Sequence, residues 1–319
     1  MNSSEILRKY AAGKTDFQGI NLKGIQLNKA DLIGINFSQA DLQGAELVLA
    51  FLNRVNLQCA NLITAKLSGA YLTQANLQGV KMADVDLHGA NLQNADLRKA
   101  NLELANLMDA NLSGADMRAI NLQGADLRGA YMRGASFRYQ KRVYEIANLR
   151  GVNMQGADMR GVDLTGADLT KADLRGANLS EVVLRGAKLT KANMREVVLD
   201  NASLTEANLV EVNLSGASLI SAKFERAELM DTCLNEANLT GASMVDAKLG
   251  KAQLVGTNLT KVNLVRADLS RANLSEANLT KADLTDAYLA KANLSNSNLH
   301  GSILTRVELS TANLSGTQM

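Results

Sequence analysis

The chain has 319 residues and a formal net charge of +2, from 34 Lys and Arg against 32 Asp and Glu, so it has no global field to attract nucleic acid or an anionic membrane. It contains no Pro and no Trp, and only 3% of its residues are aromatic, whereas 46% are hydrophobic. A conventional core of this size relies on aromatic bulk, so this supply of mainly Leu and Ala predicts a thin, regular interior.

Residues 1–13 lie before any repeat and predict a short helix. Ser3 or Ser4 can cap its start, and Gly13 is suited to end it. One face of this helix carries its apolar residues, Ile6, Leu7 and Tyr10. Because the end of a repeat structure needs a cover, we expect this segment to be a capping helix.

Residues 14–139 and 147–319 repeat with a period of five. Every fifth residue from Phe17 to Phe137, and again from Leu149 to Met319, is Leu, Met or Phe, which gives 60 repeat centres. The residue two before each centre is small or β-branched, and the residue just before it is Asn or Asp in 37 of the 60. This period places Leu on all sides of an α-helix, so it predicts instead a short extended segment followed by a corner.

The corner is predicted by the glycines, because 22 of the 24 lie two residues after a centre. Glycine adopts positive φ without steric cost, as a tight turn requires. The register breaks once, at residues 140–146. This segment is either a seven-residue loop or a two-residue bulge with one degenerate pentad, and we expect one continuous solenoid on both sides of it.

Units such as Ala90-Asn91-Leu92-Gln93-Asn94 resemble the pentapeptide-repeat family over residues 15–139 and 147–319. The resemblance implies an all-β fold, a right-handed quadrilateral β-helix with four pentads per coil and thus about 15 coils. The opening stretch from Leu7 to Gly13 is most similar to cyanobacterial members of the family.

No catalytic constellation is visible in the sequence. His88 and His300 both follow a centre, at outward positions about ten coils apart, and Cys59 and Cys233 lie on distant coils without metal-type spacing. We therefore expect no enzyme activity, no cofactor and no metal. The start of the chain lacks the pattern of a signal peptide and no stretch reaches the length of a membrane span, which predicts a cytoplasmic protein.

Residues twenty apart should stack on one face if four pentads close a coil. Arg98, Arg118 and Arg138 then form a ladder, which Asp96 and Asp116 could partly neutralise. Aromatic residues stack in the same way on another face, which they share with Ile33 and Tyr131. The candidate residues for a partner surface are Arg98, Arg118 and Arg138, then Lys141, Arg142 and Tyr144 at the register break, and the stacked pair Phe51 and Tyr71.

Charge is uneven along the chain. Residues 118–195, which we call the basic belt, carry 14 Lys and Arg against 7 Asp and Glu. The composition and the resemblance favour a non-catalytic protein–protein interaction scaffold or regulator with an unknown protein partner, as some cyanobacterial relatives bind regulators of cell differentiation. The first alternative is binding of an anionic ligand, nucleic acid or lipid, by the basic belt.

A second alternative is mimicry of DNA, as in the relatives that protect DNA gyrase, but those have a strongly acidic surface. Few aromatic residues accompany the basic ones, so nucleic acid is not the expected partner. The repeats stay in register to Met319. An uncovered last coil leads to three expectations: an end-to-end homodimer through the C-terminal coil, a natural chain that continues beyond Met319, or fraying.

Overall fold

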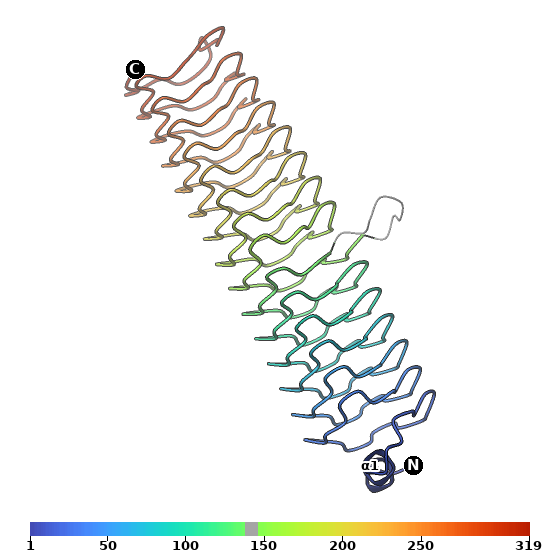
Figure 1. Ribbon diagram of the computed structural model, residues 1–319. Coiled ribbons are helices and arrows are strands. Elements are labelled where there is room, and N and C mark those ends of the chain that lie inside the picture. The colour runs from blue at the N-terminus through green and yellow to red at the C-terminus, as the bar shows by residue number, and fades with distance from the viewer. Residues whose placement is uncertain (138–145) are drawn as a thin grey trace. The chain divides into compact units, whose positions relative to one another are not determined.

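The computed structural model describes residues 1–137 and 146–319. The chain divides into two compact units, Met1–Asp163 (unit 1) and Leu164–Met319 (unit 2). Each unit is a stack of similar coils (Figure 1). Among the described residues, one helix is present, α1 (Ser3–Ala11), and the extended segments pair through isolated parallel β-bridges rather than long strands.

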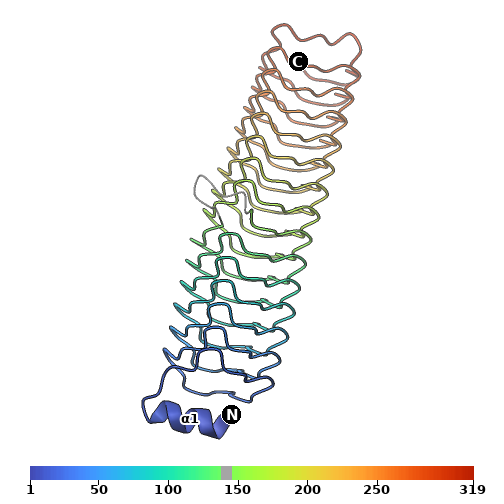
Figure 2. The ribbon, with the colours of Figure 1, turned by 90° about the vertical axis from the view of Figure 1, so that its right-hand side faces the viewer.

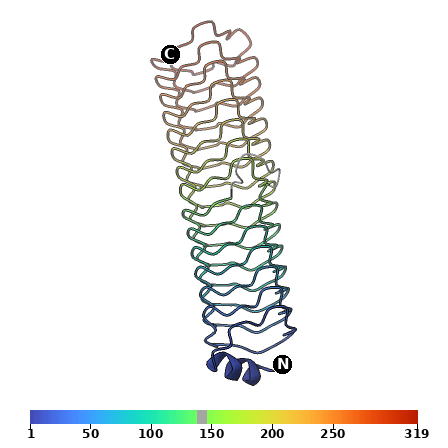
Figure 3. The ribbon, with the colours of Figure 1, turned by 45° about the vertical axis from the view of Figure 1, so that its right-hand side comes forward.

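Helix α1 lies beside the first coil of unit 1 (Figures 2 and 3). Its N-cap is Asn2, whose side chain accepts a hydrogen bond from the Glu5 N–H at 2.9 Å, so the prediction of a Ser3 or Ser4 cap was wrong by one or two positions. The predicted apolar face also needs correction, because Ile6 is fully buried while Leu7 is 38% exposed. Gly13 has a φ of +86°, as expected of the residue that ends the helix.

The coils are joined by backbone hydrogen bonds between residues twenty apart. Phe51 forms a parallel bridge with Tyr71, and Tyr71 forms one with Asn91. Within one step of this ladder, the Leu52 N–H donates to the Tyr71 carbonyl at 2.8 Å. Four pentads therefore make one coil, and residues at equivalent positions in successive coils form a column.

Each pentad turns at the two residues after its centre. The Ile25 N–H donates to the Leu22 carbonyl at 3.1 Å, which closes a β-turn with Gly24 at its third position. The φ of Gly24 is +61°, and non-glycine residues such as Lys29 adopt a similar value, +58°. The predicted role of glycine is thus confirmed, while the repeat imposes the left-handed conformation on other residues too.

The centres from Phe17 to Leu299 are buried, which confirms the prediction for nearly all of the repeat. The last coil of unit 2 is the exception, since Leu304, Leu309 and Leu314 are only partly buried and Met319 is 63% exposed. The second buried position, two residues before each centre, holds small or β-branched side chains, such as Ala90 and Val80.

The ladder shifts its offset at the register break. Asn121 bridges Asn148 and Ser136 bridges Asp163, and both offsets are 27 residues instead of twenty. The pentads on either side of the break therefore stack as if seven residues were inserted between them. Residues 138–145 themselves lie outside the described part of the chain.

A charged centre should unfold the coils around it. Leu174 is 1% exposed, so Leu174→Lys buries an ammonium group without a partner and should lower the free energy of unfolding by more than about 4 kcal/mol. Leu174→Met keeps the volume and should cost less than about 1.5 kcal/mol. Denaturant melts of both variants measure the difference, and equal melts would contradict an inward-facing centre.

Candidate interaction surfaces

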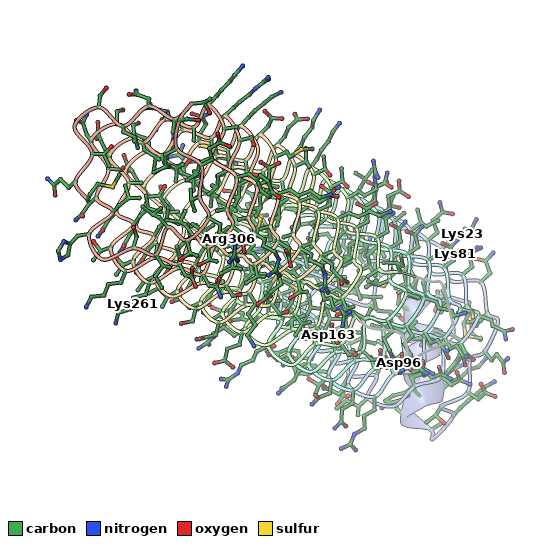
Figure 4. All side chains as sticks on the ribbon, turned by 90° about the horizontal axis from the view of Figure 1, so that it is seen from above. Lys23, Lys81, Asp96, Asp163, Lys261 and Arg306 are labelled. Carbon is green, nitrogen blue, oxygen red and sulfur yellow. The ribbon has the colours of Figure 1, made fainter. Side chains whose placement is uncertain are left out.

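The outward side chains of each unit stand in columns along the coils. Charged residues such as Lys23 and Lys81 in unit 1 and Lys261 in unit 2 project from the outside of the coils (Figure 4). Since equivalent residues of successive coils are backbone-paired, a column places side chains about 4.8 Å apart. This spacing allows direct contact between neighbours in a column, so each column behaves as one surface feature.

Phe51 and Tyr71 form the aromatic column that the sequence predicts. Their rings are stacked, with centroids 5.0 Å apart and planes 5° from parallel, and each side chain is 41% exposed. Ile33, on the same face, is also exposed, and Leu49 at the corner just before Phe51 adds an apolar side chain that the sequence analysis did not single out. Together these four residues form the apolar face of unit 1.

Two neighbouring features border the apolar face. A Cβ on residue 69 would lie 2.7 Å from Leu49 Cδ2, so Gly69 makes room for the Leu49 side chain. At the other side of the face, Ile33, Asn53 and Arg54 line a shallow hollow of about 420 Å³. The Arg54 Nε donates to the Gln74 side chain at 3.1 Å, and among the described residues no carboxylate pairs with Arg54.

Arg98 and Arg118 do form part of one ladder, but their charges are largely neutralised. Arg98 Nη2 lies 2.5 Å from Asp96 Oδ2 and its Nε lies 3.6 Å from Asp116 Oδ2, while Arg118 pairs with Asp116. Burial is the largest influence on the pKa of Asp96 and raises it, yet the hydrogen bonds from the Arg98 side chain and backbone together lower the pKa below its usual value. The ladder is therefore a chain of alternating charges.

The same Asp–centre–Arg pairing recurs in the basic belt. Arg128 pairs with Asp126 at 2.6 Å, Arg160 with Asp158 at 2.7 Å, and Arg175 with Asp173 at 2.7 Å. The hydrogen bond from Arg160 lowers the pKa of Asp158. These pairs leave the excess of basic over acidic residues in the belt unchanged, because each one joins a cation with an anion already counted in it.

Four of the predicted partner residues lie outside the described residues. They are Arg138, Lys141, Arg142 and Tyr144. The structure therefore brings Phe51 together with Tyr71 in one column and Arg98 together with Arg118 in another. Their role in binding a partner stays a prediction.

A second ladder of alternating charge follows one corner of unit 2. Its members are twenty residues apart, and each lies two residues after the centre of its pentad. They are Glu206, Arg226, Asp246, Arg266, Asp286 and Arg306. Arg266 Nε lies 2.7 Å from Asp246 Oδ1, and Arg306 Nη2 lies 2.5 Å from Asp286 Oδ2 (Arg306 is labelled in Figure 4). The hydrogen bond from Arg266 lowers the pKa of Asp246. This ladder was not predicted from the sequence, although its opposite charges recur there at a spacing of twenty residues.

Other chemistry-bearing residues stand apart. His88 and His300 are exposed, and Cys59 and Cys233 are free thiols. Within residues 1–137 and 146–319, no cluster of three or more His, Cys, Asp or Glu side chains is arranged to hold a metal ion. Nor does any helix of this described part have the length and apolar character needed to cross a bilayer.

The fold defines a class, a quadrilateral β-helix built from pentads. The family model "Pentapeptide repeats (8 copies)" matches residues 20–138, 147–246 and 252–319 in overlapping segments. The chain therefore belongs to the pentapeptide-repeat family, whose members generally act as non-enzymatic scaffolds and have a right-handed coil.

Solved structures give further likenesses. HetL, a pentapeptide repeat protein involved in heterocyst differentiation regulation from the cyanobacterium Nostoc sp. strain PCC 7120, is 31% identical over 99% of this chain and 98% of its own, with a TM-score of 0.25. Rfr23 from the cyanobacterium Cyanothece 51142 is 20% identical over 62% of this chain and 100% of its own, with a TM-score of 0.23. The chain resembles cyanobacterial members of the family, and no curated protein matches it.

The Asp96–Arg98 pair should make stability depend on pH. The pKa of Asp96 is lowered in the folded state, so its ionised form stabilises the fold above the ordinary pKa of Asp, and this contribution is lost as the pH falls through the lowered value. Asp96→Asn should cost about 0.2–1 kcal/mol at pH 7. Thermal melts from pH 7 to pH 2 should show the two proteins converging at low pH.

The control is Asp268→Asn. Asp268 accepts the same local hydrogen bond, from the Ser270 N–H at 2.9 Å, but no Arg follows it at the second position. A constant difference between Asp96→Asn and the parent protein across the pH range, like that of the control, would show that the ion pair contributes nothing.

Proposed function

We propose that this protein is a non-catalytic interaction scaffold or regulator that binds a protein partner through the apolar face of unit 1, formed by Ile33, Leu49, Phe51 and Tyr71. The family and the likeness to HetL, a protein involved in differentiation regulation, support a regulatory binding role. The observation that carries the choice of surface is the exposed aromatic stack, at a repeat position that Asn or Asp occupies in most pentads.

The exposed rings of Phe51 and Tyr71 leave apolar surface in contact with water. The column position of Phe51 and Tyr71 is the one that Asn or Asp occupies in most pentads, as at Asn91 and Asn111 in the same column. Two stacked rings with 41% of each side chain in water leave apolar area unburied, and such contiguous area marks sites of protein contact. Aromatic anchors also dominate the energy of protein interfaces.

The neighbouring hollow adds a polar requirement. Arg54 lines it together with Ile33, and the guanidinium meets the neutral Gln74 amide rather than a carboxylate. A partner that covers the rings with apolar side chains and brings an acidic group to Arg54 would satisfy both parts of the face. We therefore infer a partner segment that is apolar with at least one Asp or Glu.

Binding of an anionic ligand by the basic belt remains the second candidate, and the excess of 14 Lys and Arg over 7 Asp and Glu in residues 118–195 is the observation that favours it. The ion pairs of Arg128, Arg160 and Arg175 direct these guanidinium groups toward their own Asp, but they leave the net positive excess of the belt unchanged. The end-to-end homodimer through the C-terminal coil also stays a proposal, as does the cytoplasmic location.

Replacing the two rings should abolish partner capture without harming the fold. Asn is the usual residue at this position, so Phe51→Asn with Tyr71→Asn should leave the melting temperature within a few degrees of the parent value. Loss of two aromatic anchors at about 2 kcal/mol each should lower affinity by a factor of several hundred or more. Quantitative pull-downs from the native cell, with melts of the same preparations, measure both effects.

The matched control is Tyr131→Asn, which removes an exposed ring from the same column of unit 1 but from a position beyond Asn91 and Asn111. It should leave capture unchanged. Undiminished capture by the double variant would refute the apolar face as the partner site, and capture that disappears as salt is raised would point to the basic belt instead.

A further inference from the structure

The walls of unit 2 repeat one pattern of backbone hydrogen bonds between coils. In the wall that contains Ile303, the Leu284 N–H donates to the Ile303 carbonyl and the Ile303 N–H donates to the Ala282 carbonyl, both at 2.9 Å. A further bond, at 2.9 Å, runs from the Asp286 N–H to the Thr305 carbonyl. Each wall of a coil thus makes three bonds to the coil before it.

One wall of the last coil (residues 300–319) departs from this pattern. Among the described residues, no backbone hydrogen bond joins Leu289 or Ala287 to Glu308, and Tyr288 does not bridge Glu308. The Lys291 N–H donates to a side chain instead of a carbonyl. The next two walls of the same coil pair normally, through the bridges Asn293↔Asn313 and Asn298↔Gln318.

The departure has a local cause at Thr311. This residue occupies the corner position, two after the centre, but it is not among the residues with positive φ. A β-branched side chain disfavours the left-handed region. Thr64 has a φ of +57° at the equivalent corner, so a Thr disfavours this turn without excluding it. At Thr311 the turn relaxes, and its Oγ1 accepts the Lys291 N–H at 3.1 Å.

The opened wall contains a cavity. Its volume is about 310 Å³, and Ala287, Tyr288, Leu289 and Glu308 are among the residues that line it. Tyr288 is 65% exposed, whereas Leu289 is 1% exposed and yet its N–H has no partner in the described part of the chain. A buried backbone N–H without a partner is rare and costs as much as a lost hydrogen bond.

We propose that this open wall binds an extended segment of a partner polypeptide, one residue of which takes the ladder position that Glu308 leaves. The Leu289 N–H and the Ala287 carbonyl flank Tyr288 on the side facing the cavity. In a parallel bridge, the C=O and the N–H of a single partner residue satisfy both groups. Addition of a strand to an unpaired edge is a general mode of peptide recognition.

The charged residues at the corner beside the open wall favour an acidic side chain in the bound segment. Lys251, Arg271 and Lys291 follow one another in its column after Asp231, so three like charges stand in succession. Arg306, on the other side of the cavity, is already paired with Asp286. An acidic residue three positions after the docked residue would lie above Lys291 and be attracted by all three cations. The proposal concerns unit 2 and does not depend on the apolar face of unit 1.

The test uses the full chain and a synthetic probe, acetyl-Ala-Asn-Leu-Ser-Glu-amide, whose sequence follows the repeat itself. Hydrogen exchange read by NMR at the Leu289 amide is the measurement. About 1 mM probe should slow this exchange roughly tenfold, as expected when a buried amide gains a hydrogen bond. The same peptide with Lys in place of Glu should be weaker, and a peptide N-methylated at its Asn should have no effect.

Thr311→Gly provides a variant that closes the wall instead of damaging it. Glycine adopts the left-handed corner freely, so Glu308 should return to the ladder, and the Leu289 amide should exchange slowly without any probe. Glu276→Gly, at an exposed corner with a φ of +61°, controls for the general effect of a new glycine and should leave Leu289 unchanged.

Three results would overturn the proposal. Fast exchange at Leu289 that no concentration of the probe slows would mean that the wall binds no strand. Slow exchange in the free parent protein would mean that residues 307–311 close the wall themselves. Protection that rises with protein concentration in the absence of the probe would assign the wall to a second copy of the chain.

Discussion

The structure of each unit depends on the parallel backbone ladder between residues twenty apart. A five-residue unit with a left-handed corner turns the chain by one wall, and four such units return it to the same wall one step along the stack. The N–H of each centre then meets the carbonyl of the next coil, as Leu52 meets Tyr71 at 2.8 Å. Because the walls repeat these bonds, the side chains outside are free to differ, and function can lie in their columns or at a wall whose bonds are missing.

Because residues twenty apart are neighbours in a column, two similar side chains at this spacing form one continuous feature of the surface. Two aromatic residues twenty apart become a stack with centroids 5.0 Å apart, and opposite charges twenty apart become a ladder such as Asp246 with Arg266. Not every surface contact follows a column, since Arg128, Arg160 and Arg175 of the basic belt are each paired with an Asp of their own pentad. We expect a partner to contact the groups that have no partner within the part of the chain that the structure describes. In unit 1 these are the side chains of the apolar face, and in unit 2 they are the main-chain groups of the open wall beside three cations.

The sequence predicts the interior and the columns well, since a strict period leaves each residue one role; the burial from Phe17 to Leu299 follows from it. The sequence predicts local structure less well where several neighbouring residues could occupy the same structural position. Asn2 and Ser3 are both good N-caps, and Leu7 cannot share the buried face of Ile6 because adjacent helical residues point about 100° apart. The open wall was beyond prediction, because Thr64 and Thr311 occupy the same repeat position, yet only Thr64 has the positive φ of the corner.

The twenty-residue register is the claim on which the columns depend, and pyrene excimer fluorescence tests it most directly. In a chain whose Cys59 and Cys233 are replaced by Ser, one pair of pyrene labels goes on Asn91→Cys and Asn111→Cys, which the structure bridges, and another on Asn91→Cys and Asn101→Cys, which are closer in sequence but two walls apart. The account predicts strong intramolecular excimer emission from the first pair and monomer emission from the second. The reverse order, or equal emission from both pairs, would contradict it.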